Sequence, residues 1–216
     1  MNKINTKIAI WIIVGGTLLI WGVVLWLFKA DFNVFTSDFL KEAIKRLPIA
    51  ITIAAGIWLI FKKWIWKYFW LQNWLIVDPI IEGTWKGTLL STWINPETGE
   101  SPKELPLVLT IKQDFDNINC CIYTEESSSI SYSGKIYHDE FSDNKRFIYT
   151  YTNKPKPSVR YRSEYHDGTA NLVVVGGSRN KMEGEYWTTR KTTGEINVTF
   201  SSKKRVSSYS EAFEKE

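Results

Sequence analysis

The sequence is poor in the side chains on which most enzymes and metal sites depend: among 216 residues there are two histidines and two cysteines. It also lacks a glycine-rich phosphate loop and the Gly-x-Ser-x-Gly, His-Glu-x-x-His and Cys-x-x-Cys motifs. His138 and His166 lie far apart in the sequence, without the spacing of metal ligands. We therefore expect no metal, no cofactor and no catalytic residues, and we interpret the chain as a binding protein rather than an enzyme.

The two cysteines, Cys120 and Cys121, are adjacent in a strand-like run, where neighbouring side chains point to opposite faces. A structural disulfide between them is not expected, and a reducing compartment suits both thiols. The Asn197-Val198-Thr199 sequon would then carry no glycan.

Acidic residues are scarce in the first third of the chain. Up to Trp74 there are nine Lys and Arg but three Asp and Glu, whereas the remainder carries eighteen against twenty. Eight of the eleven tryptophans also precede Leu75. The basic character thus belongs to a segment with its own composition, so the pI of 8.9 does not indicate a protein that binds DNA or RNA. A wholly soluble single-domain protein is excluded as well.

The first long apolar run, Ile8–Phe28, has 21 residues without a charge. At about 1.5 Å of rise per residue, a helix of this length crosses the roughly 30 Å hydrocarbon core of a bilayer. A cleaved signal peptide is the competing interpretation, because Lys3 and Lys7 precede the run. The run is too long for that, and no Ala-x-Ala-like site follows it, so we predict an uncleaved span.

A second apolar run of 15 residues, Leu47–Phe61, precedes side chains of the kind found where a helix leaves a bilayer. These are Lys62, Lys63, Trp64, Trp66, Tyr68, Phe69, Trp70 and Trp74. Residues 36–46 have helical apolar spacing, with Thr36 or Ser37 as the cap and Pro48 as a kink, and this predicts an interfacial helix that leads into the second span. The second span is short for a bilayer and requires thinning, snorkelling or oligomerisation.

Small residues recur in the second span: Ala50 with Ala54, and Thr52 with Gly56, form two small-xxx-small spacings. They indicate close helix packing in an oligomer, although Gly and Ala are common in any transmembrane helix. The first span also contains small residues that permit close packing, namely Gly15, Gly16 and Gly22. Neither run contains a charged residue, so neither offers an ion or proton pathway.

Two spans place both termini on the same side of the membrane. The terminal side carries Lys3, Lys7, Lys62, Lys63 and Lys67, and the connecting loop carries Lys29, Lys41, Lys45 and Arg46. The count narrowly favours cytoplasmic termini.

After Asp78-Pro79 the apolar period changes from 3.6 to 2, and eight strand-like runs are separated by turn signals. They are 83–94, 104–113, 117–125, 129–138, 145–153, 169–176, 181–190 and 195–202. Eight such strands predict a small antiparallel barrel that is filled by side chains or holds one small ligand. Residues 154–168 form a long insert or a ninth strand. The expected organisation is a membrane region at 1–74, the barrel at 75–204 and a flexible tail at 205–216.

Gly83-Thr84-Trp85 at the start of the first strand is similar to the Gly-x-Trp of lipocalin-like barrels. In those barrels the Trp closes one end and an Arg from a late strand packs across it. We expect Trp85 to be a core residue, with Arg190 in a position to be its partner.

Cationic, aromatic and amide side chains gather in the second half of the barrel, including Arg162 in the 154–168 stretch. Arg binds phosphate in a bidentate manner, Tyr and His stack on bases, and Asn and Thr bond to base edges or ribose. The alternative for any single residue is that it lies on the barrel without a role in ligand binding. We predict a ligand site formed by Tyr149, Tyr151, Asn153, Arg160, His166, Thr169, Tyr186, Thr188 and Arg190.

The combination of two N-terminal membrane helices, an aromatic belt and a barrel that opens with Ile80-Ile81-Glu82-Gly83-Thr84-Trp85-Lys86-Gly87 resembles a known effector family. This is the SMODS-associating two-transmembrane, β-strand-rich family, the CD-NTase-associated membrane effectors of bacterial CBASS antiphage systems. The later motifs that carry the resemblance are Tyr149-x-Tyr151-x-Asn153, His166-x-Gly168-Thr169-Ala170 and Gly184-x-Tyr186-x-Thr188-x-Arg190-x-Thr192-x-Gly194-x-Ile196.

The resemblance implies a lipocalin-like eight-stranded barrel that senses a cyclic dinucleotide made by a partner CD-NTase. It also implies spans that form a homo-oligomer and disrupt the bacterial inner membrane, which kills the infected cell. The alternative is a membrane-anchored lipocalin-like carrier or signalling module for an apolar ligand. An arginine that faces the interior beside tyrosine favours the first, because a buried unpaired guanidinium is costly, and a purely aliphatic interior favours the second.

Overall fold

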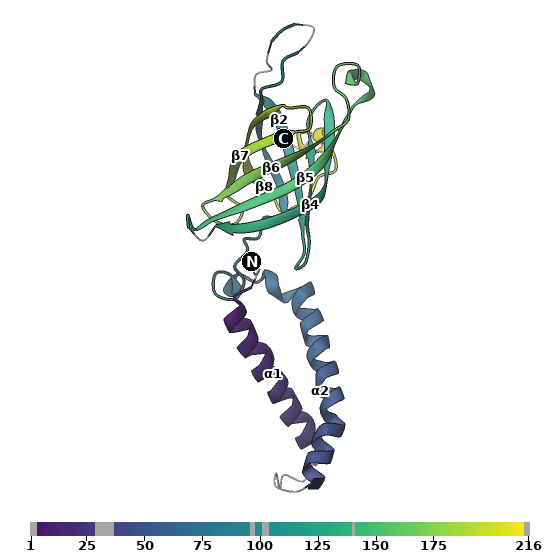
Figure 1. Cartoon of the computed structure of the whole chain (residues 1–216), viewed down its shortest axis with the longest axis vertical. Coiled ribbons are helices and arrows are strands. Elements are labelled where there is room, and N and C mark those ends of the chain that lie inside the picture. The colour runs from purple at the N-terminus through teal and green to yellow at the C-terminus, as the bar shows by residue number, and fades with distance from the viewer. Residues whose placement is uncertain (1–3, 29–36, 96–97, 101–103, 140, 214–216) are drawn as a thin grey trace. The chain divides into compact units, whose positions relative to one another are not determined.

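The computed structural model describes residues 4–28, 37–95, 98–100, 104–139 and 141–213 (Figure 1). The chain forms two compact units, one that ends at Val77 and one that begins at Asp78. The first unit is helical, and the second is a β-barrel. Each is described by itself.

The helical unit contains α1 (Thr6–Leu27) and α2 (Ser37–Lys63), both long and apolar enough to cross a membrane. The Asn5 side chain caps α1 by accepting a hydrogen bond from the Ile8 amide at 3.4 Å. Helix α2 runs without interruption through Pro48. The expected interfacial helix and the expected 15-residue span are therefore parts of one 27-residue helix, because a single proline removes only one backbone bond and the apolar pattern continues on both sides. Thr36 lies outside the described residues.

The two helices lie against each other near the ends joined by the connecting loop. Leu25 and Ala43 are buried there, with Trp21 and Phe39 packed against them. The Trp21 indole donates a hydrogen bond to the Ala43 carbonyl at 3.0 Å. Contact between late α1 and early α2 makes the pair an antiparallel hairpin (Figure 1).

Two short 3₁₀ turns follow α2, η1 (Ile65–Lys67) and η2 (Phe69–Leu71). The segment after them returns to the start of α1, where the Asn5 amide donates to the Leu75 carbonyl at 2.8 Å and Ile4 pairs with Ile76. Trp66, Leu71, Leu75 and Ile76 are buried in this junction. The aromatic segment is thus folded and is not an extended linker.

The second unit is a closed barrel of eight antiparallel strands in sequence order (Figure 1). They are β1 (Gly83–Ser91), β2 (Leu105–Gln113), β3 (Ile118–Tyr123), β4 (Ser127–Asp139), β5 (Asn144–Pro155), β6 (His166–Val175), β7 (Lys181–Thr188) and β8 (Thr193–Ser202). The predicted fold class is confirmed. We call the end where β1 begins the entry end, and the end where β1 stops the loop end. Antiparallel order places residues 92–95, 98–100, 124–126, 156–165 and 189–192 at the loop end.

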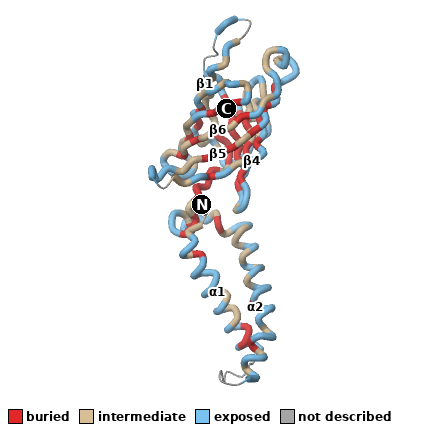
Figure 2. Tube along the Cα trace, in the orientation of Figure 1, coloured by how far each residue is buried: buried red, intermediate tan, exposed pale blue. Residues whose placement is uncertain are grey.

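The core side chains pack together inside the barrel, and Figure 2 marks the buried positions along its strands in red. Buried residues alternate along β3 and β5 as the period-2 pattern predicts, whereas residues 107–111 of β2 are all buried. The largest fully buried side chains include Trp85, Leu107, Leu109, Phe147, Leu172 and Met182. Cys120 is buried, Cys121 is half-buried, and both are free thiols, as their adjacency predicted.

Trp85 is a core residue, as predicted, but Arg190 is not its partner. Trp85 packs edge-on against Phe200, with ring centroids 5.3 Å apart. The Phe200 ring is instead contacted by Arg179, whose guanidinium carbon lies 5.5 Å from its centroid. Arg190 follows β7 at the loop end, because the register pairs Trp85 with Phe200 but Ser91 with Gly194.

Residues 154–168 add no ninth strand. The stretch completes β5, forms a 3₁₀ turn η3 (Pro157–Val159) and enters β6 at His166. The first strand is also shorter than expected, since β1 stops at Ser91. The shorter β1 lengthens the connection to β2, whereas β5 and β6 extend into the 154–168 stretch and shorten the connection between them.

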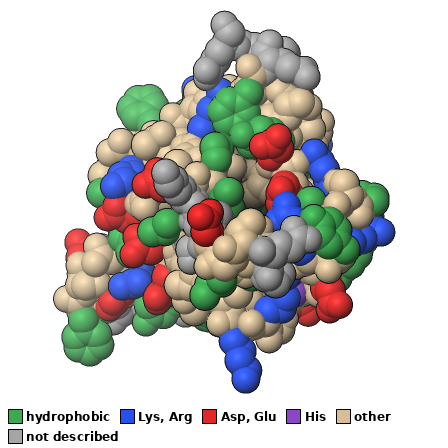
Figure 3. Space-filling model, turned by 90° about the horizontal axis from the view of Figure 1, so that it is seen from above, with side chains coloured by type: hydrophobic (Ala, Val, Ile, Leu, Met, Phe, Trp, Pro, Cys, Tyr) green, Lys and Arg blue, Asp and Glu red, His purple; other side chains and the backbone are tan. Residues whose placement is uncertain are grey.

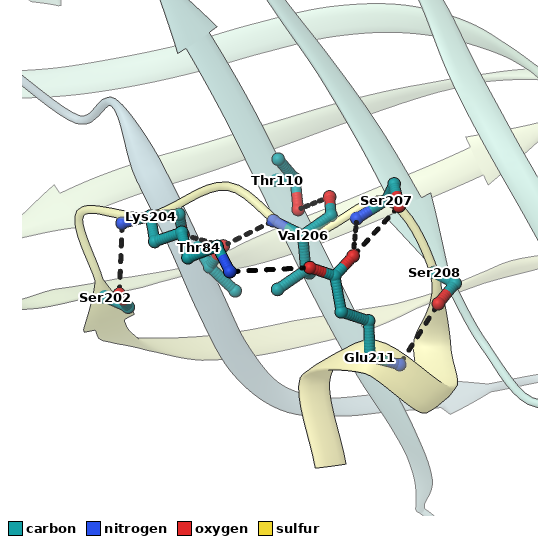
Figure 4. A network of polar contacts seen from close by, with 8 residues as sticks. All are labelled: Thr84, Thr110, Ser202, Lys204, Val206, Ser207, Ser208 and Glu211. Carbon is teal, nitrogen blue, oxygen red and sulfur yellow. Dashed lines mark hydrogen bonds and ion pairs between the residues drawn. The ribbon is translucent and has the colours of Figure 1, made fainter. Parts of the chain in front are cut away.

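A flexible tail was expected from residue 205, and the described part of the chain after β8 lies against the barrel. Residues 203–213, which we call the strap, cross the outside of β1 and β2 and contain helix α3 (Tyr209–Phe213) (Figure 4). The Thr84 hydroxyl donates to the Lys204 carbonyl at 2.6 Å and accepts from the Val206 amide at 3.3 Å. Thr110 donates to the Val206 carbonyl at 3.1 Å. Side-chain hydroxyls of β1 and β2 therefore hydrogen-bond to the backbone of the strap, which has no neighbouring strand to pair with.

We expect Thr84→Val to lower the free energy of unfolding of the barrel by about 1–2 kcal/mol, because two strap backbone groups lose their partner. Thr88→Val, on the same strand, is the matched control, since its side chain forms no hydrogen bond with any residue that the structure describes. The measurement is denaturant unfolding of the full-length protein in detergent, followed by near-ultraviolet circular dichroism. Equal midpoints for the two variants would show that the strap does not stabilise the barrel.

Candidate ligand-binding cavity

The interior of the barrel is open at the loop end and forms a cavity of about 910 Å³. This volume is within the range of small-molecule sites, roughly 300–1,000 Å³. Its deeper wall is apolar, with Leu89, Ile122 and Ile196. The polar and aromatic lining includes Ser91, Trp93, Ser129, Tyr151, Asn153, Arg162, Ser163, His166, Tyr186 and Arg190.

Two tyrosines lie in this cavity because the strands beside them carry glycine. Tyr151 on β5 pairs with Gly168, and Tyr186 on β7 pairs with Gly194. A β-carbon at Gly168 would lie 2.6 Å from the Tyr151 ring, and one at Gly194 would lie 2.5 Å from the Tyr186 ring. Each ring therefore occupies the space over a glycine on the neighbouring strand. This gives a physical reason for two glycines of the motifs noted in the sequence.

Arg190 extends from the β7–β8 turn towards β6. Its guanidinium donates to the Ser163 hydroxyl at 3.2 Å and lies 3.4 Å from His166 Nε2. Its Nε is buried and has no hydrogen-bond partner among the described residues. A buried N–H without an acceptor costs free energy, and this one belongs to a group that binds phosphate well.

The turn that carries Arg190 is held by threonines. The Thr188 amide donates to the Thr192 carbonyl at 2.9 Å, and the two hydroxyls are 2.6 Å apart. The Thr189 amide donates to the Asp167 carbonyl at 2.9 Å. Thr188 thus supports the position of Arg190 from below the turn.

His166 is a neutral hydrogen-bond acceptor in this arrangement. Its Nδ1 lies 2.9 Å from the Glu164 carbonyl, which requires the proton on Nδ1 and leaves Nε2 as acceptor for Arg190. Burial lowers the pKa of His166, and the positive charge of Arg190 lowers it further. Burial also lowers the pKa of Arg190, which stays charged, and raises the pKa of Tyr151 and Tyr186, which stay neutral. The part of the cavity wall formed by Tyr151, His166, Tyr186 and Arg190 therefore carries one full positive charge, that of Arg190.

The adjoining part of the wall, on β4 and β5, is polar and neutral. The Ser129 hydroxyl on β4 donates to Asn153 Oδ1 on β5 at 2.8 Å, and both residues are buried. The Asn153 amide group is thereby oriented, and its NH₂ is available to an acceptor on a ligand.

A second arginine spans the loops at the rim. Arg162 forms an ion pair with Glu126 at 2.5 Å, and its guanidinium carbon is 5.8 Å from the Trp93 ring. Trp93 follows β1, and Arg162 follows η3, so their contact joins two loops. Seen from above, positive and negative side chains are interspersed over this face (Figure 3). The cavity lining itself carries Arg162 and Arg190 together with Glu100 and Glu126.

The structure places five of the nine predicted site residues in the cavity lining: Tyr151, Asn153, His166, Tyr186 and Arg190. The other four lie elsewhere. Tyr149 is 1% exposed and packs in the core between Phe147 and Tyr151. Arg160 is exposed and rests on the Tyr165 ring, 5.2 Å from its centroid. Thr169 faces outwards on β6, between the buried residues Gly168 and Ala170. Thr188 forms the hydrogen bonds that hold the β7–β8 turn.

The sequence-based site missed Trp93, Ser129, Glu126 and Ser163, and it left Arg162 unassigned. Ser129 could have been predicted, because the pairing of β4 with β5 places it opposite Asn153. Trp93, Glu126 and Ser163 lie in connections between strands, where periodicity gives no direction. Among the described residues, no three His, Cys, Asp or Glu side chains gather as they would around a metal ion.

The fold and the cavity together define a class of protein, a β-barrel ligand-binding domain joined to two apolar helices. Within that class, the family described as "Cap15, cyclic dinucleotide receptor domain" matches residues 77–199, more than half of the chain. The chain therefore belongs to this family. It is also 28% identical over 159 residues to CD-NTase-associated protein 15 of Escherichia albertii, an alignment that covers 72% of this chain and 78% of that protein. The family resemblance inferred from the sequence is confirmed.

The lowered pKa of His166 gives a prediction with a defined sign. The unfolded chain takes up this proton near pH 6.5, whereas the folded chain takes it up only at lower pH. Between the pKa of His166 in the unfolded chain and its lower pKa in the folded chain, the unfolded state binds more protons than the folded state. The free energy of unfolding therefore falls as the pH drops through 6.5. We expect His166→Gln to flatten the loss of unfolding free energy between pH 7.5 and pH 5.5. An unchanged slope would contradict a buried, neutral His166.

Proposed function

We propose that the barrel binds a cyclic dinucleotide in the loop-end cavity and that binding promotes association of the two apolar helices. Helix association then disrupts the inner membrane, as expected of a CBASS-type antiphage effector. The proposal places both helices across the membrane with cytoplasmic termini, where a nucleotide made by a partner CD-NTase is available. Membership of the cyclic dinucleotide receptor family supports the ligand class.

The observation that carries the proposal is the buried Nε of Arg190, which lacks an acceptor inside a cavity. A phosphate oxygen satisfies such a group with a charge-assisted hydrogen bond. Tyr151 and Tyr186 lie beside it and offer faces for a base or ribose. Arg162 at the rim offers a second cation, once its bond to Glu126 is exchanged for one to a phosphate. A ligand with two phosphates and two bases matches this set.

The alternative, a carrier of an apolar ligand, fits the cavity less well. The core side chains of the interior, aliphatic and aromatic, pack together towards its entry end. The open part has an apolar deeper wall but also presents charged, hydroxyl and amide groups, which an apolar ligand would bury without partners.

The helical unit offers surfaces for association. Ala50 is fully buried, Ala54 and Gly56 are half-buried, and Thr52 is exposed. No atom lies within 4 Å of the position that a β-carbon would take at Gly56, Gly15, Gly16 or Gly22. The glycine notches are thus not used by the hairpin itself and are open to another chain. A ligand drives association only if it binds better to the associated state than to the separate one.

The ligand proposal is tested by calorimetric titration of the full-length protein in detergent with cyclic dinucleotides that carry adenine, guanine or uracil. We expect Arg190→Ala to weaken binding about tenfold to hundredfold, because it removes charge-assisted hydrogen bonds. Arg160→Ala is the matched control, an arginine on the adjacent loop but outside the cavity, and should bind like the parent. Unchanged affinity in Arg190→Ala removes Arg190 from the site, and a parent that binds none of the ligands overturns the proposal.

The output proposal is tested with Gly56→Leu. The open space at Gly56 lets the hairpin fold with leucine there, so a defect reports on contacts between chains. We expect normal ligand affinity but loss of ligand-dependent leakage from vesicles that contain the protein. Ala55→Leu adds the same bulk to the neighbouring face of α2 and should leak like the parent. Leakage by Gly56→Leu at the parent rate would show that this face is not the packing face.

A further inference from the structure

One edge of the Arg190 guanidinium faces His166. The planar guanidinium offers Nε and Nη2 side by side, and a phosphate accepts two parallel N–H bonds from such an edge. Nε is buried and has no hydrogen-bond partner among the described residues. Nη2 lies 3.4 Å from His166 Nε2, whereas Nη1 donates to the Ser163 hydroxyl at 3.2 Å. The edge that suits a phosphate is therefore the edge beside the imidazole.

His166 is held so that its protonation changes only at Nε2. Its Nδ1 donates to the Glu164 carbonyl at 2.9 Å, so this nitrogen carries a proton in the neutral and in the charged ring. Nε2 is the bare nitrogen of the neutral ring, because the guanidinium of Arg190 offers it only donors. A phosphate oxygen bound to Nη2 would lie beside this bare nitrogen, and both atoms are acceptors. A proton on Nε2 turns that repulsion into a further charge-assisted hydrogen bond.

The surroundings of His166 keep the ring neutral without a phosphate. Burial lowers its pKa most, and the positive charge of Arg190 lowers it as well, whereas the hydrogen bond to the Glu164 carbonyl and the charge of Asp167 raise it. Asp167 Oδ1 in turn accepts a hydrogen bond from the Thr152 hydroxyl at 2.6 Å. The charged and titratable groups that surround His166 or line the cavity with it are Glu100, Glu126, Tyr151, Arg162, Glu164, Asp167, Tyr186 and Arg190.

A phosphate on Arg190 reverses this balance. Its negative charge offsets the positive charge of the guanidinium, and an anion within about 4–6 Å raises the pKa of a histidine by roughly 1–3 units. The protein alone thereby avoids two adjacent buried cations, and the second cation forms only when an anion is present to pair with it.

We propose that His166 takes up one proton from the solvent when the ligand binds, and that the imidazolium donates from Nε2 to the phosphate held by Arg190. The inference rests on the proposed function, since it requires a phosphate-bearing ligand in the loop-end cavity. Binding then becomes stronger as the pH falls, by at most about tenfold per pH unit for one proton. The increase lies between the pKa of His166 in the complex and its lower pKa in the protein alone.

Calorimetric titration of the full-length protein in detergent at pH 6.5 counts the protons taken up. It is carried out in Pipes and in bis-Tris, because the two buffers absorb different heats when they release a proton. The ligand is the tightest-binding of the adenine, guanine and uracil cyclic dinucleotides. We expect uptake of roughly half to one proton per ligand, and an affinity that rises about tenfold from pH 8 to pH 6.

Two variants remove the titrating ring in different ways. His166→Gln keeps a side-chain acceptor for Arg190, and His166→Asn keeps a donor for the Glu164 carbonyl. Both should bind with no proton uptake and with an affinity that is flat between pH 8 and pH 6. The matched control is His138→Gln, which changes the other histidine of the chain, bonded to Asp143 at 2.8 Å on the β4–β5 hairpin. It should keep the uptake of the parent.

Nitrogen-15 spectra of histidine-labelled parent protein locate the proton without any variant in the cavity, and His138→Gln assigns the two rings. The Nε2 signal of His166 should change from the bare to the protonated form when the ligand is added at pH 6.5. Equal binding heats in the two buffers, an unchanged Nε2 signal, or uptake that persists in both His166 variants would each overturn this inference and leave the proposed function standing. A parent that binds none of the ligands overturns both.

Discussion

The size of the inward-facing side chains along the barrel determines where a ligand can bind. Near the entry end the interior holds Trp85, Phe147 and Leu109, which are large and fully buried. Towards the loop end the inward positions on β4 and β5 become Ser129 and Asn153, and the volume is open. A closed eight-stranded sheet has little space to begin with, so this gradient confines any ligand to one end.

The same decrease in side-chain size towards the loop end also determines which chemical groups line the cavity. Tyr151 and Tyr186 mark the boundary between the filled and the open part, and each is accommodated by a glycine on the neighbouring strand. Above them, Arg190 is held by a threonine-supported turn and retains one unsatisfied N–H. Leaving a buried donor unpaired disfavours the ligand-free state, and an anion recovers that free energy on binding.

The sequence predicted the parts of the structure that depend on periodicity. Alternation of apolar residues placed all eight strands within a few residues of their bounds and separated two long helices from the barrel. Tyr151 and Tyr186, which were assigned to the ligand site, both lie in the cavity lining. Periodicity failed where a position depends on a turn or a loop: Arg190 was expected to pack near Trp85, yet the β7–β8 turn carries it to the opposite end.

Similar limits explain the remaining differences. Arg160 and Arg162 are two residues apart in a connection without regular structure, so nothing in the sequence told which one lines the cavity. Pro48 suggested a break, whereas the apolar pattern on either side keeps α2 continuous. The strap after β8 is polar and near the end of the chain, and its order depends on the hydroxyls of Thr84 and Thr110, which lie over 90 residues earlier.

The central claim is that the ligand of this receptor family occupies the loop-end cavity of this chain. Hydrogen–deuterium exchange of the full-length protein, with and without a saturating cyclic dinucleotide, tests it most directly. The account predicts slower exchange in residues 124–129, 153–166 and 186–193, and no change in the entry-end turns at 114–117 and 176–180. Protection confined to the entry end or to the strap, with the loop end unchanged, would contradict it.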